Sequence, residues 1–307
     1  MLYARLAQLV EHPLDVGRVV GSSPTPRTME TKNTVILYHG NCLDGFGAAY
    51  AAWKKFEDSA TYIAVFHGDT HPQGLAGKEV YIADFSYPKE QLLELERQTK
   101  RLVVLDHHEG AREYVELVRE YVFDNNRSGS GITWEYFNAG TPLPRLLAYI
   151  QDGDLWRHSL PNWREVGAYL STVPFTFETF DTLATTFADD TQFEKIIQKG
   201  AAFAQYRDYL CEKFIESAQE VQFDEFSVLA VNAPRLFNSQ VGNLLAQKHP
   251  PFAIVWYPHG DQWHFSLRGT GEVDLAAVAQ RRGGNGHHNA ASFRVPFGQP
   301  FPFSFKK

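Results

Sequence analysis

The sequence predicts an α/β protein built on a doubly wound parallel sheet, and three observations lead to this prediction. Apolar runs such as Leu102–Leu105 have the length and composition of strands that are buried on both faces. Stretches of helical composition separate these runs along the first half of the chain. Several runs end in an acid or a histidine, as in Asp106-His107-His108. Ligands bind beside the carboxyl ends of strands in such sheets, so the pattern predicts a functional site there.

The predicted elements of the first part begin at Thr34. An alanine-rich helix ends near Phe56, and Pro88 suits the first turn of a second helix, which extends to about Lys100. Strands are expected over residues 34–38, 61–66, 79–85, 101–105 and, in a shorter form, 121–124. An amphipathic segment over 132–138 and a helix over 145–150 follow.

The second part begins with a long helix, which the pattern places over residues 193–221. After it, strands are expected over 227–232, 252–257, 263–268 and 291–295, with helices over 239–248 and 275–280 and a turn over 283–288. We therefore expect a metal-binding domain over 29–192, a linker helix over 193–224 and a smaller α/β domain over 225–307.

The first 28 residues differ from the remainder of the chain. Back-translation of residues 7–11 and 21–25 can give the D-arm and T-arm sequences of a transfer RNA gene, at about the right separation. We expect residues 1–28 to be a non-native, disordered leader and translation to start at Met29. An ordinary flexible N-terminal extension is the alternative.

The composition is that of a globular protein: 307 residues, 44% hydrophobic and 21% charged, with a net charge of −7. The negative charge argues against a general nucleic-acid coat but leaves room for a local basic groove. Cys42 and Cys211 lie far apart, which suits a reducing compartment. The sequence has neither a secretory signal nor an apolar run near the ~20 residues of a membrane span. A cytoplasmic protein without a membrane partner is expected.

Imidazoles and carboxylates at the predicted strand ends indicate a metal site. The candidate ligands are His39, Asp44, Asp84, His107 and one of Asp152 or Asp154. Such ligands suit Mn²⁺, Mg²⁺, Fe or Zn. They exceed the needs of one ion, and two ions about 3.5–4 Å apart with a bridging carboxylate would use them. Asp84 is expected to bridge because its strand should lie between the others. The expected reaction is hydrolysis of a phosphoester or phosphoanhydride.

Further residues have alternative interpretations. Asp106 is expected to orient the ring of His107 rather than bind metal, and His108 either faces the substrate phosphate or is packed. Arg268 is either a solvated charge or an anion clamp, and the glycines from Gly283 to Gly286 form a plain turn or an anion-binding backbone. Three tryptophans could stack on bases, although core packing is favoured for most aromatic residues: Trp156, Trp256 and Trp263.

Together these stretches resemble the DHH phosphoesterase superfamily with its DHH-associated C-terminal domain, from Thr34 to about Val295. The first motif resembles His39–Ala49, the second Asp84, the third Asp106-His107-His108 and the fourth Asp152 or Asp154. The resemblance implies a phosphoesterase with two Mn²⁺ ions, or Mg²⁺, in the larger domain and an active site in the cleft between the domains. Asp106 and His108 are then the catalytic candidates. The substrate-binding candidates are Arg268, Gly283, Gly284, Gly286 and His287.

The first motif departs from the family pattern of two aspartates two residues apart. Only Asp44 is present, with Asn41 and Cys42 nearby, so the number of bound ions stays open between one and two. In the fourth motif Asp152 is preferred over Asp154, because its spacing to Trp156 is more similar to that of the family.

The leading function is hydrolysis of short oligonucleotides or small nucleotide phosphoesters by water attack at a two-metal site. One alternative is a polyphosphate or pyrophosphate hydrolase, which a cleft lined purely by Lys and Arg would favour, whereas aromatic residues would favour nucleotides. The other alternative is a nucleotide- or RNA-binding module with an impaired metal site. Substrate length, cleavage polarity, base preference and oligomeric state, including a homodimer, stay open.

Overall fold

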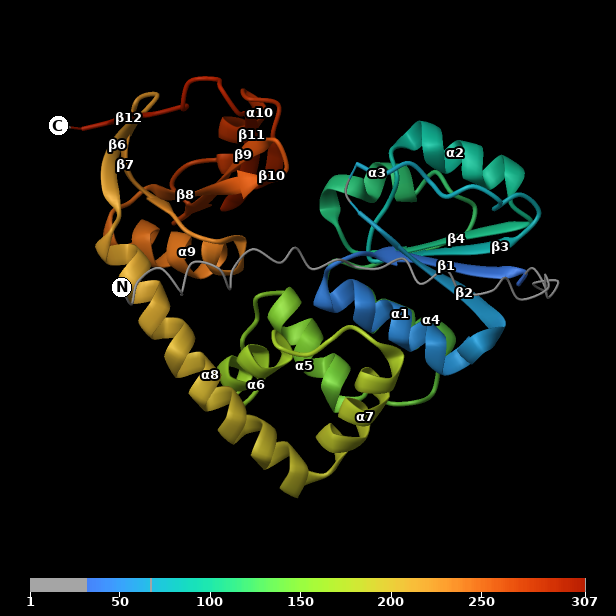
Figure 1. Cartoon of the computed structure of the whole chain (residues 1–307). Helices are drawn as coiled ribbons and strands as arrows, with labels where there is room; N and C mark the ends of the chain where they lie inside the picture. The colour runs from blue at the N-terminus through green and yellow to red at the C-terminus, as the bar shows by residue number, and fades with distance from the viewer. Residues whose placement is uncertain (1–31, 67, 307) are drawn as a thin grey trace, which may run out of the picture.

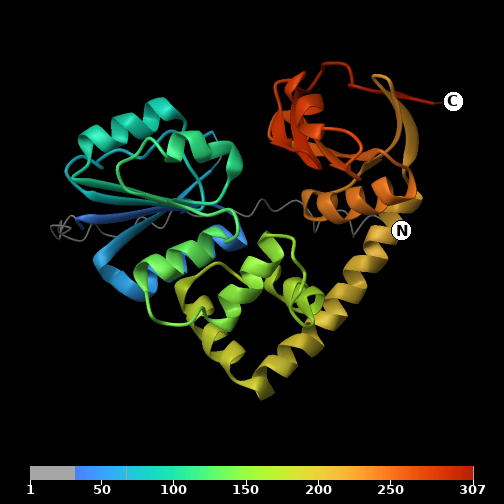
Figure 2. The same cartoon turned by 180° about the vertical axis from the view of Figure 1, so that it is seen from behind.

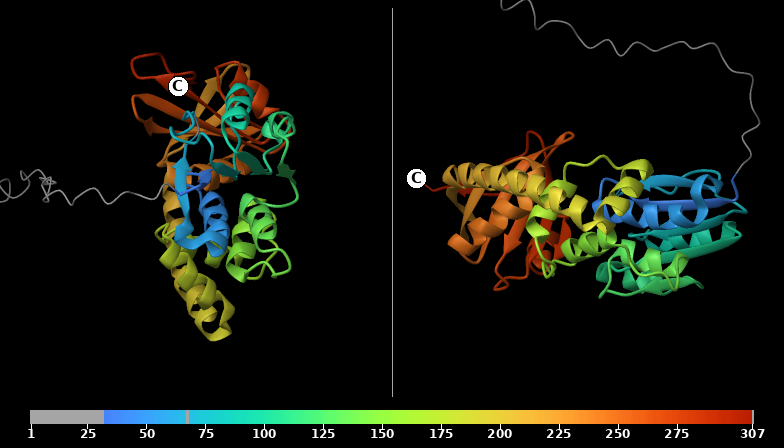
Figure 3. Two further views of the ribbon diagram at one scale, coloured as in Figure 1. Left: turned by 90° about the vertical axis from the view of Figure 1, so that its right-hand side faces the viewer. Right: turned by 90° about the horizontal axis from the view of Figure 1, so that it is seen from below.

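Two β-sheets joined by a long helix make up the computed structural model, which describes residues 32–66 and 68–306. Helix α8 (Asp190–Glu216) runs diagonally from the helices beneath the first sheet to the second sheet (Figures 1 and 2). Seen from below, the two sheets lie at opposite ends of the molecule (Figure 3). The expected leader, residues 1–28, lies outside the described residues.

The first sheet is parallel throughout, with strand order β2-β1-β3-β4-β5. Its strands are β1 (Thr34–His39), β2 (Ala60–Val65), β3 (Glu79–Ala83), β4 (Arg101–Asp106) and β5 (Tyr121–Phe123). The order reverses between β1 and β3, which is where an open parallel sheet binds its ligand. Strand β3 lies between β1 and β4, as expected for the strand that precedes Asp84.

Helices cover both faces of this sheet, so the doubly wound prediction is confirmed. Helices α1 (Leu43–Phe56) and α4 (Gly129–Phe137) lie on one face, and α2 (Lys89–Gln98) and the short α3 (Arg112–Val115) on the other (Figure 1). On the second face, Leu92 and Leu95 of α2 are fully buried in a cluster with strand residues such as Ile82. Burial of such side chains stabilises the layers by about 1.5–3 kcal/mol each.

A helical layer below the sheet contains two helices that the sequence did not predict. The layer consists of α5 (Arg145–Asp154), α6 (Trp163–Leu170) and α7 (Phe177–Ala188). Residues 173–193 are rich in Thr and Phe, which favour strands locally. Phe180, Leu183 and Phe187 are nevertheless spaced for one face of a helix, and all three are buried against α1 and α5.

The linker helix ends earlier in the chain than predicted. It ends at Glu216 rather than 221, and Gln219–Phe223 forms strand β6 instead, so the expected linker helix over 193–224 is wrong in its last part. Val221 and Phe223 are buried while Glu220 and Gln222 are exposed. This alternation has the two-residue period of a strand, which the helical pattern before it obscured.

The second sheet is mixed and has the order β10-β11-β9-β8-β7-β6-β12. Its other strands are β7 (Phe226–Asn232), β8 (Phe252–His259), β9 (Gln262–Gly269), β10 (Asn285–His287), β11 (Ala290–Pro296) and β12 (Ser304–Phe305). Among the described strands of this second sheet, only β7 and β8 pair in parallel. Residues 285–287 pair with β11 and are therefore strand rather than turn.

Two helices pack on this sheet, and both match the prediction. Helix α9 (Asn238–Lys248) buries Val241 and Leu245 against β8, and α10 (Leu275–Gln280) buries Leu275 in a separate aromatic cluster. Short 3₁₀ turns complete the chain at Glu57–Ser59, Glu109–Ala111 and Arg235–Phe237. Within residues 32–66 and 68–306, no helix combines the length and apolarity needed to cross a bilayer.

Candidate metal centre and substrate cleft

Asp84 lies at the centre of the candidate site, immediately after β3. It is 1% exposed, and its φ of 65° lies in the left-handed region, which Asp adopts more readily than most residues. Its Oδ1 lies 3.2 Å from Nε2 of His107, and its Oδ2 lies 3.4 Å from Nδ1 of His39. The two carboxylate oxygens therefore face histidines from two different strand ends.

Two glycines allow helices to approach these strand ends closely. A Cβ on Gly129, in the first turn of α4, would lie 2.4 Å from the Cβ of Asp84. A Cβ on Gly45, in the first turn of α1, would lie 2.2 Å from the carbonyl oxygen of His39. Only glycine fits at such distances, so the N-termini of α1 and α4 reach the acids, and helix N-termini favour negative charge.

Asp44, in the first turn of α1, is 1% exposed and is held by the N-terminus of α4. Its Oδ1 accepts hydrogen bonds from the hydroxyls of Ser128 and Ser130 at 2.7 and 2.6 Å, and from the backbone N–H of Ser130 at 3.2 Å. These bonds fix the carboxylate beside His107 and Asp154, with ligand atoms of the three residues within 4.8 Å of one another.

Asp154 rather than Asp152 faces this group, which contradicts the preference drawn from the sequence. Oδ2 of Asp154 lies 3.6 Å from Nε2 of His107. Asp152 instead accepts hydrogen bonds from the hydroxyl and backbone N–H of Ser159, at 2.6 and 3.0 Å. Two positions along a helix are rotated by about 200°, so the two side chains of α5 point to opposite sides.

Asp106 orients His108 and not His107, which is a second correction. Its Oδ1 accepts from Nδ1 of His108 at 2.8 Å, and from the backbone N–H groups of His107 and His108 at 2.8 and 3.2 Å. Burial lowers the pKa of His108, but the hydrogen bond and charge of Asp106, together with Asp84 and Asp154, raise it to about 9. At neutral pH this imidazole is therefore a cation beside the acids.

We call Asp44, Asp84, Asp154, His39 and His107 the acidic cluster. Burial raises the pKa of Asp84 well above its usual range, and Asp44 raises it further. Burial and Asp44 also raise the pKa of Asp154 to about 6. Burial and Asp84 raise the pKa of the nearby Cys42 thiol to about 12. Each shift has the same cause, which is negative charge confined in a poorly hydrated space.

The cluster also contains buried polar atoms that lack hydrogen-bond partners among the residues described. They are Nδ1 of His39 and the Oδ2 atoms of Asp84, Asp106 and Asp154. Buried carboxylates without partners are costly, and a divalent cation removes both the desolvation cost and the mutual repulsion. The residues present therefore fit one or two divalent cations.

A cavity of about 450 Å³ lies between the end of β1 and the second sheet, and His39 is the member of the acidic cluster that lines it. His39, Gly40 and Asn41 at the end of β1 form one side of it. The opposite side comes from β8, β9, β10, β11 and the segment before α9, and includes the predicted residues Arg268, Gly286 and His287. Of the predicted residues, this cavity brings together His39, Arg268, Gly286 and His287, whereas the carboxylates of the acidic cluster are not among the residues that line it.

Gly283 and Gly284 do not line the cavity in the described chain, unlike Gly286. Gly283 has a φ of 70° and closes the turn after α10, while a Cβ on Gly284 would lie 2.2 Å from the carbonyl oxygen of Ser292. Both glycines therefore serve the backbone path. The prediction of substrate contact for them is not supported by their positions.

Arg268 is held in place from two sides. Its Nη1 donates to the Ser266 hydroxyl at 2.9 Å and to the Leu267 carbonyl at 2.8 Å, and its Nη2 donates to the Ser239 hydroxyl at 2.9 Å. Its Nε is buried and has no hydrogen-bond partner within the described residues. A guanidinium fixed in this way is preorganised to bind an anion.

Sequence reasoning missed five further cationic or titratable residues of the cavity: Arg235, Tyr257, His259, His264 and Arg294. We call Arg235, Arg268 and Arg294 the cationic wall. Burial lowers the pKa of His264 to about 4, and Arg294, His259, Arg235 and Arg268 contribute to the shift. His264 is therefore uncharged at neutral pH, and the three arginines make the wall positive in a chain with a net charge of −7.

The sequence of β9 contains a pattern that indicates part of this wall. His264, Ser266 and Arg268 alternate along β9 and so project from one face of the strand. Strand β11 continues the same surface, because Arg294 pairs with His264 and Ser292 pairs with Ser266. The alternation indicates a polar face, but only the register shows which arginine joins it.

Two of the three tryptophans pack in the core, as the core-packing interpretation favoured, and the third is exposed. Trp256 and Trp263 pack edge-to-face at 5.3 Å and contact Phe301 in the second sheet's cluster. Trp156 is 60% exposed and lies 5.3 Å from the ring of His158. The aromatic residues that line the cavity are instead Phe66, which is 51% exposed beside Gly40, and Tyr257.

These features define a DHH-domain fold, and two solved structures support it. A DHH domain described as a member of a family of ribosomal proteins has a TM-score of 0.56 at 10% identity, over 89% of this chain and 83% of that one. RecJ from Thermus thermophilus, solved in complex with Mn²⁺, has a TM-score of 0.51 at 12% identity. That comparison covers 86% of this chain and 50% of RecJ. The DHH resemblance of the sequence is thereby confirmed for the fold.

A curated relative shows the family. The protein named "Uncharacterized protein R106", from Acanthamoeba polyphaga mimivirus, is 32% identical over 298 residues, which are 88% of this chain and 70% of the relative. The chain belongs to the same family as this mimivirus protein. No family model matches the sequence.

Proposed function

We propose that the protein is a metal-dependent phosphoester hydrolase that acts on short oligonucleotides or small nucleotide phosphoesters. The observation that carries this proposal is the position of Asp84 between two groups of potential ligands. Its Oδ1 faces His107 at 3.2 Å and its Oδ2 faces His39 at 3.4 Å. A carboxylate with one oxygen toward each group is arranged as a bridge between two cations.

The residues that would hold the cations are those of the acidic cluster. Asp44, His107 and Asp154 would form one position, and His39 would belong to the other, with Asp84 shared. Oxygen and imidazole ligands suit Mn²⁺ or Mg²⁺, and RecJ, which has a similar fold, has been solved with Mn²⁺. Bound cations of this kind supply a more acidic water and neutralise phosphate charge.

His108 and Asp106 would act on the substrate side. Asp106 accepts a hydrogen bond from Nδ1 of His108, and this bond favours the protonated imidazole. This leaves the Nε2–H of His108 to donate to a phosphate oxygen or to protonate the leaving group. Asp106 is a positioning residue in this scheme, because its contacts are to the two histidines.

The cationic wall would bind the phosphate groups. Arg268 is fixed by its hydrogen bonds, and Arg235 and Arg294 line the same cavity. Charge-assisted bonds from guanidinium to phosphate are among the stronger polar contacts in proteins. A cavity of about 450 Å³ suits a small ligand.

The aromatic character of the cavity favours nucleotides over polyphosphate. Phe66 exposes its ring at the cavity, and Tyr257 stacks on His264 with centroids 4.8 Å apart. Rings of this kind can stack on bases, at about 1–3 kcal/mol per base. Polyphosphate offers no group for them. A division into two domains joined by α8 and a cytoplasmic location complete the proposal.

A hydrolysis screen with Mn²⁺ tests the proposal. The substrates are dinucleotides, short RNA, single-stranded DNA, 3′-phosphorylated nucleotides and polyphosphate, with Asp84→Ala as the inactive control. We expect turnover of a dinucleotide or 3′-phosphorylated nucleotide that chelation removes. Turnover of polyphosphate alone would select the polyphosphate alternative. Substrate binding without turnover, at fewer than two bound ions, would select the binding module.

A further inference from the structure

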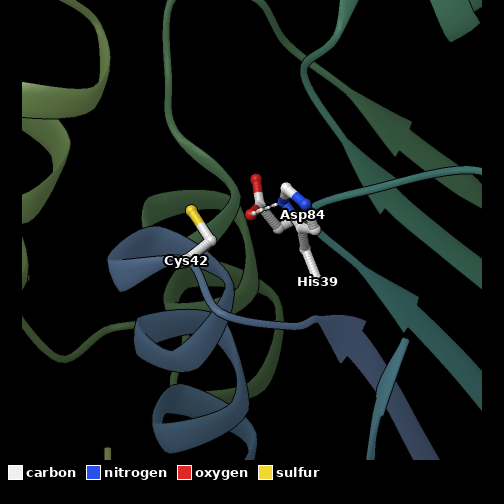
Figure 4. A group of neighbouring side chains, drawn as sticks. All are labelled: His39, Cys42 and Asp84. Carbon is white, nitrogen blue, oxygen red and sulfur yellow. Dashed lines mark ion pairs between the residues drawn. The ribbon is translucent and has the colours of Figure 1, made fainter. Parts of the chain in front are cut away.

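Cys42 lies beside His39 and Asp84 of the acidic cluster and has no role in the proposed mechanism. It directly precedes α1, and its thiol lies with the imidazole of His39 and the carboxylate of Asp84 so that the three ligand atoms are within 4.8 Å of one another. Figure 4 shows the three side chains gathered where β1 ends, α1 begins and β3 ends. Distances of this size are compatible with a shared ion after small side-chain adjustments.

The neighbours of this thiol are themselves short of partners. Asp84 is 1% exposed and its Oδ2 has no hydrogen-bond partner in the described chain, and the same is true of Nδ1 of His39. These two atoms lie 3.4 Å from each other, and both residues offer a ligand atom to the group that contains the Cys42 sulfur. A buried carboxylate gathered with an imidazole and a thiol is the arrangement of a ligand set.

The other cysteine provides the contrast. Cys211 is fully buried in an apolar cluster with residues such as Val231, Val241 and Leu245, where a cysteine packs as a small apolar side chain. Cys42 has polar neighbours and is partly exposed beside the substrate cavity. The two thiols therefore differ in environment although both are free.

We propose that Cys42 is a metal ligand and that His39, Cys42 and Asp84 form a position selective for borderline cations such as Zn²⁺, Co²⁺ or Fe²⁺. This proposal deepens the proposed function and rests on its metal centre. Thiolate sulfur favours such ions over Mn²⁺ and Mg²⁺, which prefer oxygen. The thiol releases its proton to solvent when it binds the ion. The second position, with Asp44, His107 and Asp154, keeps its preference for harder ions.

Cobalt absorption tests the ligand directly, without reference to activity. Metal-free protein is titrated with Co²⁺, while calorimetry counts the bound ions and absorption records the near-ultraviolet thiolate-to-cobalt charge-transfer band. The variants are Cys42→Ser and, as the matched control, Cys211→Ala. We expect the band in the wild type and in Cys211→Ala, and its loss in Cys42→Ser.

The outcomes separate this proposal from the proposed function. Cobalt binding to the wild type without the band, or a band that persists in Cys42→Ser, would overturn the role of Cys42 and leave the metal centre intact. Failure of Co²⁺, Zn²⁺ and Mn²⁺ to bind the wild type would overturn the metal centre as well.

Metal selectivity gives a second measurement that does not depend on the serine variant. Cys42→Asp replaces the thiolate with a carboxylate and so should lower the preference for Zn²⁺ over Mn²⁺ by about tenfold or more. Competition calorimetry measures this ratio, and a thermal melt in chelator confirms that the variant is folded. An unchanged ratio in folded Cys42→Asp would contradict the proposal.

Discussion

The acidic cluster and the cationic wall have opposite charges and come from different elements of the fold. The acidic cluster comes from the strand ends of the first sheet, the start of α1 and the end of α5. Asp44 and Asp84 are almost fully buried, and Asp154 is partly exposed. The cationic wall comes largely from the face of β9 and β11 and directly lines the cavity. The net charge of −7 is a sum over the whole chain, so it does not show that negative and positive groups are separated in this way. The acidic cluster is suited to bind cations, and the cationic wall is suited to bind an anionic substrate.

Removing the central acid should have the largest effect. Asp84→Asn keeps the shape of the side chain but cannot bridge two cations, so we expect hydrolysis to fall by about 10³-fold or more. Steady-state rates in saturating Mn²⁺ measure the loss. Asp152→Asn is the matched control, since Asp152 is bound to Ser159 and should affect stability rather than rate. A near-normal rate for Asp84→Asn would remove the bridging role.

Removing one arginine of the cationic wall should have a smaller effect on hydrolysis and should change KM more than kcat. Arg268→Ala should raise KM by about 10- to 100-fold with a smaller change in kcat, because charged hydrogen bonds contribute about 1.5–3 kcal/mol. Arg281→Ala is the control, as Arg281 is solvent-exposed beside Glu225 and outside the cavity. Equal KM values for the two variants would contradict the anion-binding role of the wall.

Divalent cations should stabilise the acidic cluster selectively. At a free concentration of about 100 times Kd, a bound ion adds about 2.7 kcal/mol to the free energy of unfolding. Thermal melts with Mn²⁺ and with chelator measure the difference. The gain should shrink strongly in Asp84→Asn and stay unchanged in Arg268→Ala. A similar gain in all three proteins would indicate binding elsewhere.

The metal-free protein should lose stability as the pH rises. The pKa of Asp154 is about 6 in the fold against 3.8 for the ordinary carboxyl, so its protonated form favours folding. This contribution is complete below pH 3.8 and is lost as the pH rises through about 6. Its full size is about 3 kcal/mol, of which roughly half is lost between pH 5 and 7.5. Chelator melts between pH 5 and 7.5 measure it, and Asp154→Asn should flatten the dependence. An unchanged slope in that variant would contradict the repulsion described for the acidic cluster.

The strand ends of the first sheet were predictable because their signals are local. The run from Leu102 to Leu105 marks a doubly buried strand, and parallel strands bring their carboxyl ends to one edge. The same reasoning predicts the strand of Asp84 between its neighbours, and Asp84 does lie between His39 and His107. Helix α7 was missed because strand-favouring Thr and Phe residues concealed its helical spacing.

The choices between neighbours could not be made from the sequence. Whether Asp152 or Asp154 faces His107 depends on the rotation of α5 against the sheet, and Ser159 lies in a loop that captures Asp152. Asp106 binds the ring of His108 because the chain turns immediately after β4 and presents two backbone N–H groups to the same oxygen. Such details follow from packing and loop geometry rather than from residue type.

The sequence alone determined the doubly wound sheet, its chemically rich strand ends and the resemblance to DHH proteins, because period and composition are local properties. Tertiary structure alone decided that Arg235 and Arg294 join Arg268 on one wall, and that Cys42 lies with His39 and Asp84. These groupings depend on strand register, on helix starts brought close by Gly45 and Gly129, and on the placement of the second sheet across the cavity. Contacts between residues far apart in the chain are set by packing, which one-dimensional patterns do not encode.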